Sequence, residues 1–267
     1  MARTSRRRAP APGRTCALAA VLLAGALPAA RAQLPTDVRW GAQLRYTSDY
    51  LYRGYSKSAD RPTVQVNVSA DGEAGWFAGV WASAVDFGEA RFEFNPYAGW
   101  LFRLGPDWQL EAAVAGFLYD ARTYGEGNGY ADLGARLRFR DLASVRVGVA
   151  PDAYGAGEAI PTFEMDARYP LTDVLEVSVL AGHSLSQTAL DYDHTWYGVG
   201  FTRYLGRHVA LELRYQGARE SNDTAPSYGG SGNFYGGHDA YVHARAAETA
   251  DASMYTDRIV LSLSIGF

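Results

Sequence analysis

Two short segments carry the residue types that nucleophilic or metal chemistry requires. Gly182-His183-Ser184-Leu185-Ser186 places a histidine beside a serine, the base and nucleophile that a lipid hydrolase would use. Asp191-Tyr192-Asp193-His194 offers carboxylate oxygens that could bind a divalent cation. His183 and Ser184 are adjacent on a predicted strand, however, so their side chains point to opposite faces. The acidic side chains of a predicted loop are ordinarily solvated.

Two glycine-rich runs, Gly229-Gly230-Ser231-Gly232 and Gly236-Gly237, do not form a phosphate-binding loop, because no lysine follows them and no strand-to-helix context exists. We therefore predict that the chain is not an enzyme and that it has no catalytic, cofactor-binding or metal site.

A different chemistry is suggested by charged residues that recur at every second position, where they could line a polar passage. The predicted inward basic residues are Arg39, Arg45, Arg91, Arg103, Arg136, Arg138, Arg146, Arg168, Arg214 and Arg258. The predicted inward acids are Glu93, Glu111, Asp132, Glu164, Asp166, Glu176 and Glu212. Of these we predict as pore-lining Arg39, Arg45, Arg91, Glu93, Arg136, Arg138, Glu164, Arg168, Glu212 and Arg214. The excess of arginine predicts a mild preference for anions, unless cross-strand ion pairs plug the interior.

The elements that position these residues are β-strands, since apolar and polar residues alternate from Val38 to the end of the chain. Val64, Val66 and Val68, for example, alternate with polar neighbours. A period of two sends successive side chains to opposite faces of a strand. We predict strands at 38–48, 62–70, 75–86, 90–104, 108–119, 130–140, 143–150, 160–170, 174–185, 195–205, 208–218 and 257–267. Strands of this length can cross a bilayer when tilted.

The lengths of the connections alternate as well. Tight turns are predicted at 71–74, 105–107, 141–142, 170–173 and 206–207, and longer loops at 49–61, 120–129, 151–159, 186–194 and 219–256. Short periplasmic turns and long outer loops are typical of outer-membrane barrels. Composition alone would fit a secreted β-sandwich, but a sandwich gives no reason for this alternation. We predict an all-β fold, a transmembrane antiparallel up-and-down β-barrel of about twelve strands with a long extracellular loop at 219–256.

Both ends of the chain fit export and assembly. Residues 1–32 combine a basic start, an apolar core from Cys16 to Leu27 and the cleavage pattern Ala30-Arg31-Ala32, which predicts a cleaved signal peptide followed by a barrel over 33–267. Six of the 25 basic residues and none of the 29 acidic ones lie in this segment, so 19 basic residues remain and a nucleic-acid partner is disfavoured. Phe267 closes an alternating strand and is predicted to be an assembly signal for the barrel assembly machinery.

One stretch resembles a known family. The segment Ser48-Asp49-Tyr50-Leu51-Tyr52-Arg53-Gly54-Tyr55-Ser56-Lys57-Ser58, followed by Pro62-Thr63-Val64-Gln65 and by the run from Gly75 to Gly88, is similar to the N-terminal part of the TorF porin family, once described as conserved hypothetical proteins (Gcw_chp). The resemblance is specific over about residues 46–104 and generic afterwards. It implies a small outer-membrane barrel and suggests a pore, without a substrate or catalytic residues.

The sequence thus predicts an outer-membrane porin for the passive passage of small polar or ionic solutes, surrounded by outer-membrane lipids and lipopolysaccharide. Two alternatives remain open at this point: an outer-membrane lipid hydrolase, and a structural or adhesive barrel without an open pore.

Overall fold

The computed structural model describes residues 37–123, 128–190, 192–221 and 257–267. In this part of the chain twelve antiparallel strands form a closed barrel in the order β1-β14-β13-β12-β11-β10-β9-β8-β7-β6-β5-β4. The predicted fold class and strand number are therefore confirmed. The wall strands are β1 (Val38–Thr47), β4 (Thr63–Gly72), β5 (Trp76–Phe87), β6 (Ala90–Arg103), β7 (Trp108–Tyr119), β8 (Gly129–Phe139), β9 (Ala143–Ala150), β10 (Ile160–Thr172), β11 (Leu175–Ser184), β12 (Asp193–Tyr204), β13 (Val209–Ser221) and β14 (Arg258–Gly266).

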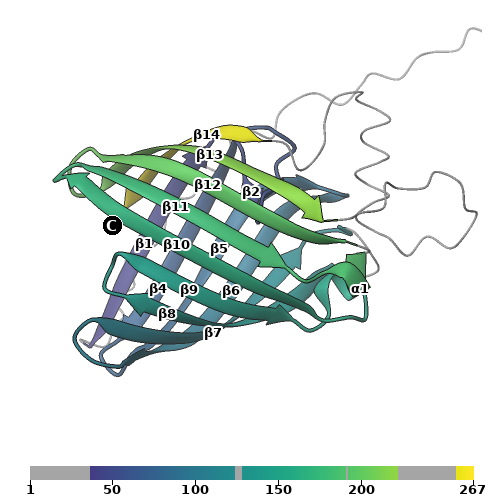
Figure 1. Ribbon diagram of the computed structural model, residues 1–267, viewed down its shortest axis with the longest axis horizontal. Helices are drawn as coiled ribbons and strands as arrows, with labels where there is room; N and C mark the ends of the chain where they lie inside the picture. The colour runs from purple at the N-terminus through teal and green to yellow at the C-terminus, as the bar shows by residue number, and fades with distance from the viewer. Residues whose placement is uncertain (1–36, 124–127, 191, 222–256) are drawn as a thin grey trace, which may run out of the picture. The chain divides into compact units, whose positions relative to one another are not determined.

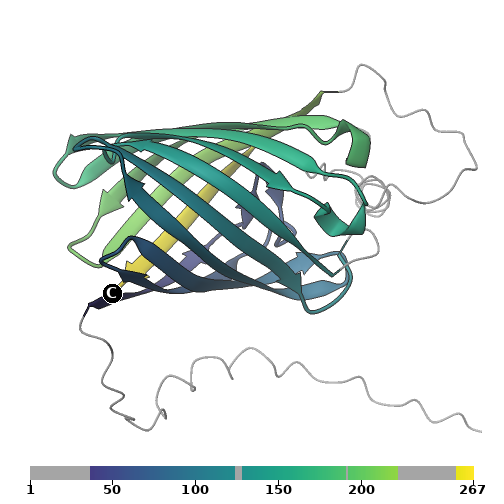
Figure 2. The ribbon, with the colours of Figure 1, turned by 90° about the horizontal axis from the view of Figure 1, so that it is seen from below.

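The barrel closes between its first and last strands. β1 pairs with β14 from Gln43↔Gly266 to Thr47↔Ser262 and with β4 along its whole length. Figures 1 and 2 show the strands running obliquely around the barrel. Closure leaves no strand edge unpaired in the wall, which is the condition for placing a sheet in hydrocarbon, where backbone groups find no other partner.

The two faces of the wall are the reverse of those of a soluble protein. Val64, Val66 and Val68 of β4 point outward and are 44–46% exposed, whereas Thr63 and Gln65 are buried inside. The same inversion runs around the wall, where the exposed residues include Trp40, Leu44, Phe94, Val147, Phe201 and Leu213. An outer surface this apolar requires an apolar environment around it.

The five tight turns lie within a few residues of their predicted positions. Residues 73–75, 104–107, 140–142, 173–174 and 205–208 form tight turns at one end of the barrel. At the other end the connection between β5 and β6 is also tight, at residues 88–89, where Gly88 adopts a φ of +66°. That end also carries the short helix α1 (Gln187–Leu190). Among the described residues, no helix is long and apolar enough to cross a membrane.

Two predicted segments fall largely outside the described residues. The signal peptide at 1–32 lies wholly outside them, as do residues 222–256 of the predicted long loop. The start of that loop is corrected, because β13 continues to Ser221. Arg219, Glu220 and Ser221 pair with Thr195, His194 and Asp193 of β12, so the wall extends three residues further than the alternation indicated.

The connection at 49–61 is the main departure from the prediction, which placed it among the outer loops. It contains a hairpin of β2 (Leu51–Tyr52) and β3 (Tyr55–Ser56), and it folds into the barrel. We call residues 49–61 the inner hairpin. Tyr50, Tyr55 and Lys57 are buried, and Tyr50 and Tyr55 belong to the barrel's hydrophobic core. This core lies inside the end of the barrel to which the long connections belong.

Candidate functional site

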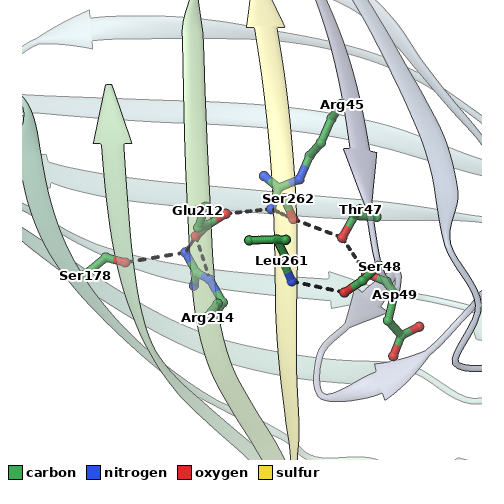
Figure 3. Close-up of polar contacts among 9 residues, drawn as sticks. All are labelled: Arg45, Thr47, Ser48, Asp49, Ser178, Glu212, Arg214, Leu261 and Ser262. Atoms are coloured by element: carbon green, nitrogen blue, oxygen red, sulfur yellow. Dashed lines mark hydrogen bonds and ion pairs between the residues drawn. The ribbon is translucent and has the colours of Figure 1, made fainter. Parts of the chain in front are cut away.

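Three of the charged clusters that the described residues form inside the barrel concern the site, and each spans several strands. The first, the Glu212 cluster, joins β13 to β1 (Figure 3). Glu212 Oε2 accepts a hydrogen bond from Arg45 Nη2 at 2.6 Å, and its Oε1 accepts one from Arg214 Nε at 2.8 Å. Arg45 Nη2 also donates to Ser262 Oγ at 2.9 Å, and Ser262 donates to Thr47 Oγ1 at 2.9 Å. Because one carboxylate serves two guanidinium groups, the cluster carries an excess positive charge.

The second cluster, the Arg53 cluster, connects the inner hairpin to the wall. Arg53 Nη2 lies 2.9 Å from Asp132 Oδ2 on β8, and Arg53 Nε lies 3.1 Å from Glu164 Oε1 on β10. Arg146 on β9 pairs with the same two carboxylates, at 3.1 Å from Glu164 Oε1 and in direct contact with Asp132 Oδ1. Burial lowers the pKa of Arg53, but the surrounding tyrosines, Glu164 and Asp132 together raise it well above its usual value, so the group stays charged.

The third cluster, the Lys57 cluster, is wholly removed from solvent. Lys57 Nζ lies 3.0 and 3.1 Å from the two carboxylate oxygens of Glu93 and donates to Tyr119 Oη at 2.7 Å. The side chains of Lys57 and Glu93 are both 0% exposed.

Aromatic rings surround this ammonium group. Nζ lies 4.1 Å from the ring centroid of Tyr52 and 5.0 Å from that of Phe117, within the range of a cation–π interaction. Burial lowers the pKa of Lys57 to about 8, against the attraction of Glu93. Lys57 therefore remains mostly protonated at neutral pH.

The ten residues predicted to line a pore divide into inner and rim positions. Six take part in inner ion pairs or clusters: Arg45, Glu93, Arg138, Glu164, Glu212 and Arg214. Three lie in exposed pairs near the barrel ends: Arg39 with Asp71, Arg91 with Asp86, and Arg168 with Asp141. The tenth, Arg136, lines a small cavity together with Arg138 and Arg168, and its Nε has no hydrogen-bond partner within the described ranges.

Two larger cavities occupy the interior. One, of about 870 Å³, lies against Arg39, Glu111, Arg138, Arg146 and Tyr97. The other, of about 500 Å³, lies between the inner hairpin and the Glu212 cluster and is lined by Arg45, Arg53, Glu164, Arg214 and Trp81. The ion pairs therefore do not fill the barrel, and space for water and small solutes remains beside them.

Two charged residues of the site, Arg53 and Lys57, are absent from the predicted set. Both lie in the segment assigned to an outer loop, where a cation would be solvated. A signal was present in the composition of this segment, because Tyr50, Tyr52 and Tyr55 alternate closely with the two cations. Aromatic side chains at this density are costly to expose to water and indicate a packed segment.

The described residues of the segments weighed for enzyme and metal chemistry take part in contacts of the wall and of one turn. His183 pairs in register with Phe163, which is exposed on the outer wall, whereas Ser184 pairs with the buried Thr162. His183 and Ser184 thus lie on opposite faces, as the alternation predicted. His183 Nδ1 lies 2.8 Å from Thr195 Oγ1.

Of the two aspartates in the segment weighed as a cation site, Asp191 lies outside the described residues and Asp193 organises the turn before it. Its Oδ1 accepts hydrogen bonds from the backbone amides of Ser186 at 2.7 Å and Gln187 at 2.8 Å. Across the ranges that the structure describes, no group of three or more His, Cys, Asp or Glu residues is placed to hold a metal ion.

The fold is similar to that of solved outer-membrane proteins at low sequence identity. The NanC porin superposes with a TM-score of 0.51 at 10% identity, over 85% of this chain and 99% of that one. The KdgM porin gives a TM-score of 0.50 at 8% identity, again over 85% and 99% of the two chains. At these identities the likeness concerns the fold.

Sequence comparison places the chain in a family. No curated protein matches it. A family described as "Bacterial protein of unknown function (Gcw_chp)" matches residues 29–247, which is most of the chain and includes nearly the whole barrel wall. The chain therefore belongs to the Gcw_chp family.

Proposed function

We propose that this protein is an outer-membrane channel, a porin in the sense implied by the TorF name, for the passive passage of small polar or ionic solutes. The observation that carries the proposal is a closed barrel with an apolar outer wall and a hollow, charged interior, with cavities of about 870 and 500 Å³. An apolar wall needs lipid around it, and a charged interior needs water within it.

The location and assembly route are part of this proposal. Residues 1–32 direct export and are then removed, and the barrel assembly machinery recognises the strand that ends at Phe267. The mature barrel is surrounded by outer-membrane lipids and lipopolysaccharide. In support, Phe267 is 78% exposed although its ring stacks on His208 at 5.9 Å, so most of its side chain is accessible to a recognition factor.

We further propose that the channel prefers anions mildly and that nine of the ten residues named above line it, since the tenth, Glu93, is covered by the inner hairpin. Glu212 is shared between Arg45 and Arg214, which leaves an excess positive charge in mid-barrel. The cavity beside Arg136 is lined by four arginines and only two aspartates. Fixed charge in a low-dielectric wall acts strongly on passing ions. The KdgM porin, which has this fold, has been solved in complex with disordered oligogalacturonate, a polyanion.

Planar-bilayer recording tests both parts of the proposal. The purified protein should give discrete conductance steps, and in a salt gradient its reversal potential should shift toward that of the anion. Arg136→Glu combined with Arg138→Glu should reduce or invert this shift. Arg122→Glu combined with Arg207→Glu is the matched control, because both residues are exposed in connections and the change in charge is the same.

Each outcome bears on a different part of the proposal. Conductance steps whose reversal potential does not shift toward that of the anion would refute the proposed selectivity but not the channel. The absence of steps would refute the channel, and cleavage of phospholipid or lipid A that His183→Ala abolishes would replace it with a hydrolase.

A further inference from the structure

The inner hairpin crosses the interior of the barrel from one wall to the other. It leaves the wall after β1, and Arg53 at its tip pairs with Asp132 on β8 and Glu164 on β10. In the closed order of strands, β9 is six positions from β1 in either direction, so β8 and β10 flank the point directly opposite β1. A loop that reaches this point spans the full width of the lumen.

The remaining contacts attach the hairpin to other parts of the wall. Lys57 binds Glu93 on β6 and Tyr119 on β7. Gly54, with a φ of +88°, lies so close to β12 and β13 that an added Cβ would stand 2.4 Å from Ala218 Cβ and 2.9 Å from Trp196 Cβ. The hairpin therefore touches the wall on several sides and leaves little free cross-section at its level.

The base of the hairpin is held equally firmly. Asp49 Oδ1 accepts hydrogen bonds from Ser56 Oγ at 2.6 Å and Ser58 Oγ at 2.8 Å. Asp60 pairs with Arg258 of β14 at 2.7 Å. The backbone amide of Asp86 on β5 donates to the carbonyl oxygen of Lys57 at 2.8 Å. These bonds fix the hairpin in the lumen as an ordered element.

The space beside the hairpin is correspondingly small. Next to Tyr55, Tyr130 and Arg53 the free volume is about 30 Å³, room for one or two water molecules. On the inner side of the hairpin the barrel opens into the cavity of about 500 Å³. At the level of the hairpin, therefore, the contacts named above leave only this small space next to Tyr55 and Tyr130.

We propose that the inner hairpin is the constriction of the channel, and that Arg53 is the latch that holds its tip against the opposite wall. This inference rests on the proposed channel function and adds the element that limits which solutes pass. Release of the tip would join the cavity of about 500 Å³ to the outer end of the barrel.

The arrangement of charges makes Arg53 removable without damage to the wall. Asp132 and Glu164 each retain Arg146 as a partner when Arg53 is absent. Neither carboxylate is then left buried and unpaired, which is the usual reason that breaking an inner ion pair unfolds a protein. Arg53→Ala therefore removes the contact between the hairpin tip and the wall and leaves the ion pairs within the wall in place.

The test compares single-channel conductance in planar bilayers for four proteins. These are the native barrel, Arg53→Ala, a variant with residues 51–56 replaced by six glycine and serine residues, and Arg61→Ala as the matched control. Arg61 belongs to the same hairpin but pairs with Asp86 at the exposed rim, with its side chain 65% exposed. Folding of each variant is checked by its altered gel migration without heating.

We expect the hairpin replacement to raise the conductance by about two- to fivefold, since a barrel of twelve strands encloses a lumen wide enough to leave a water-filled path once the loop is removed. Arg53→Ala should add transient steps toward the larger value, and Arg61→Ala should match the native protein. Equal steps in the native, Arg53→Ala and replaced proteins would overturn the constriction and leave the channel intact. The absence of steps in all four would overturn the channel itself, and the constriction with it.

Discussion

Replacing Lys57 by methionine should release the inner hairpin. Lys57 and Glu93 are both excluded from solvent, and Lys57 supplies the positive charge that faces the Glu93 carboxylate. Methionine keeps the length and the apolar stem of the lysine side chain, so packing against the rings of Tyr52 and Phe117 is largely preserved. What is lost is the charge, and with it the partner of a buried carboxylate.

The size of the effect follows from that loss. Removal of one partner from a buried ion pair costs about 3–5 kcal/mol, because the remaining charge is left without compensation. This cost is avoided when the hairpin undocks, because the Glu93 carboxylate is then exposed to water. Since about 1.4 kcal/mol corresponds to a factor of ten, the docked population should fall about a hundredfold to a few thousandfold relative to the undocked one.

Native-state hydrogen exchange measures this ratio directly. The amide of Lys57 donates to the carbonyl oxygen of Tyr50 at 2.8 Å, and it should lose about two to three orders of magnitude of protection in Lys57→Met. The amide of Tyr204, bonded to the carbonyl oxygen of Val174 at the other end of the barrel, should keep its protection and serves as the internal control.

A second variant separates charge from packing. Lys57→Met combined with Glu93→Gln leaves no charge unpaired, so most of the protection should return. Full protection in Lys57→Met alone would refute the claim that this ion pair holds the hairpin. Equal loss in the single and double variants would show that lysine acts through its packing and not through its charge.

Two further outcomes are expected. Gly54→Ala should loosen the hairpin and raise the conductance, because the added methyl group would clash with Ala218 and a left-handed backbone costs alanine about 1–2 kcal/mol. The control is Gly206→Ala: Gly206 has a similar φ but open space around it, so this change should leave the conductance unchanged. Phe267→Ala should lower the yield of assembled barrel while the melting temperature of the protein that does assemble stays the same, and an unaltered yield would contradict its role in assembly.

The wall of the barrel could be predicted almost completely from the sequence. Each of the twelve observed strands begins and ends within three residues of its predicted bounds. The reason is physical: a wall between lipid and water imposes a period of two on every strand, and the period is visible residue by residue. The largest difference is at Ser221, where pairing with Asp193 extends β13 beyond the point at which the alternation fades.

The inner hairpin could not be predicted in the same way, because what docks it is not local. Arg53 binds residues 79 and 111 positions further along the chain, Asp132 and Glu164, and no periodicity within the hairpin encodes those contacts. The alternation that predicts a strand indicates only on which face of the wall a side chain lies. It does not predict which segments pack inside the barrel.

This docking changes how the charge of the interior must be counted. The predicted excess of arginine over acid considers the wall strands alone, in which Glu93 and Glu164 count as free negative charges. In the folded protein the hairpin brings Lys57 to the first and Arg53 to the second. The acids of the outer half are thus neutralised by a loop, whereas Arg45 and Arg214 still share a single carboxylate further in. An anion preference in this barrel would therefore arise in the Glu212 cluster and near Arg136, on the inner side of the constriction, and not from a uniform excess of positive charge along the wall.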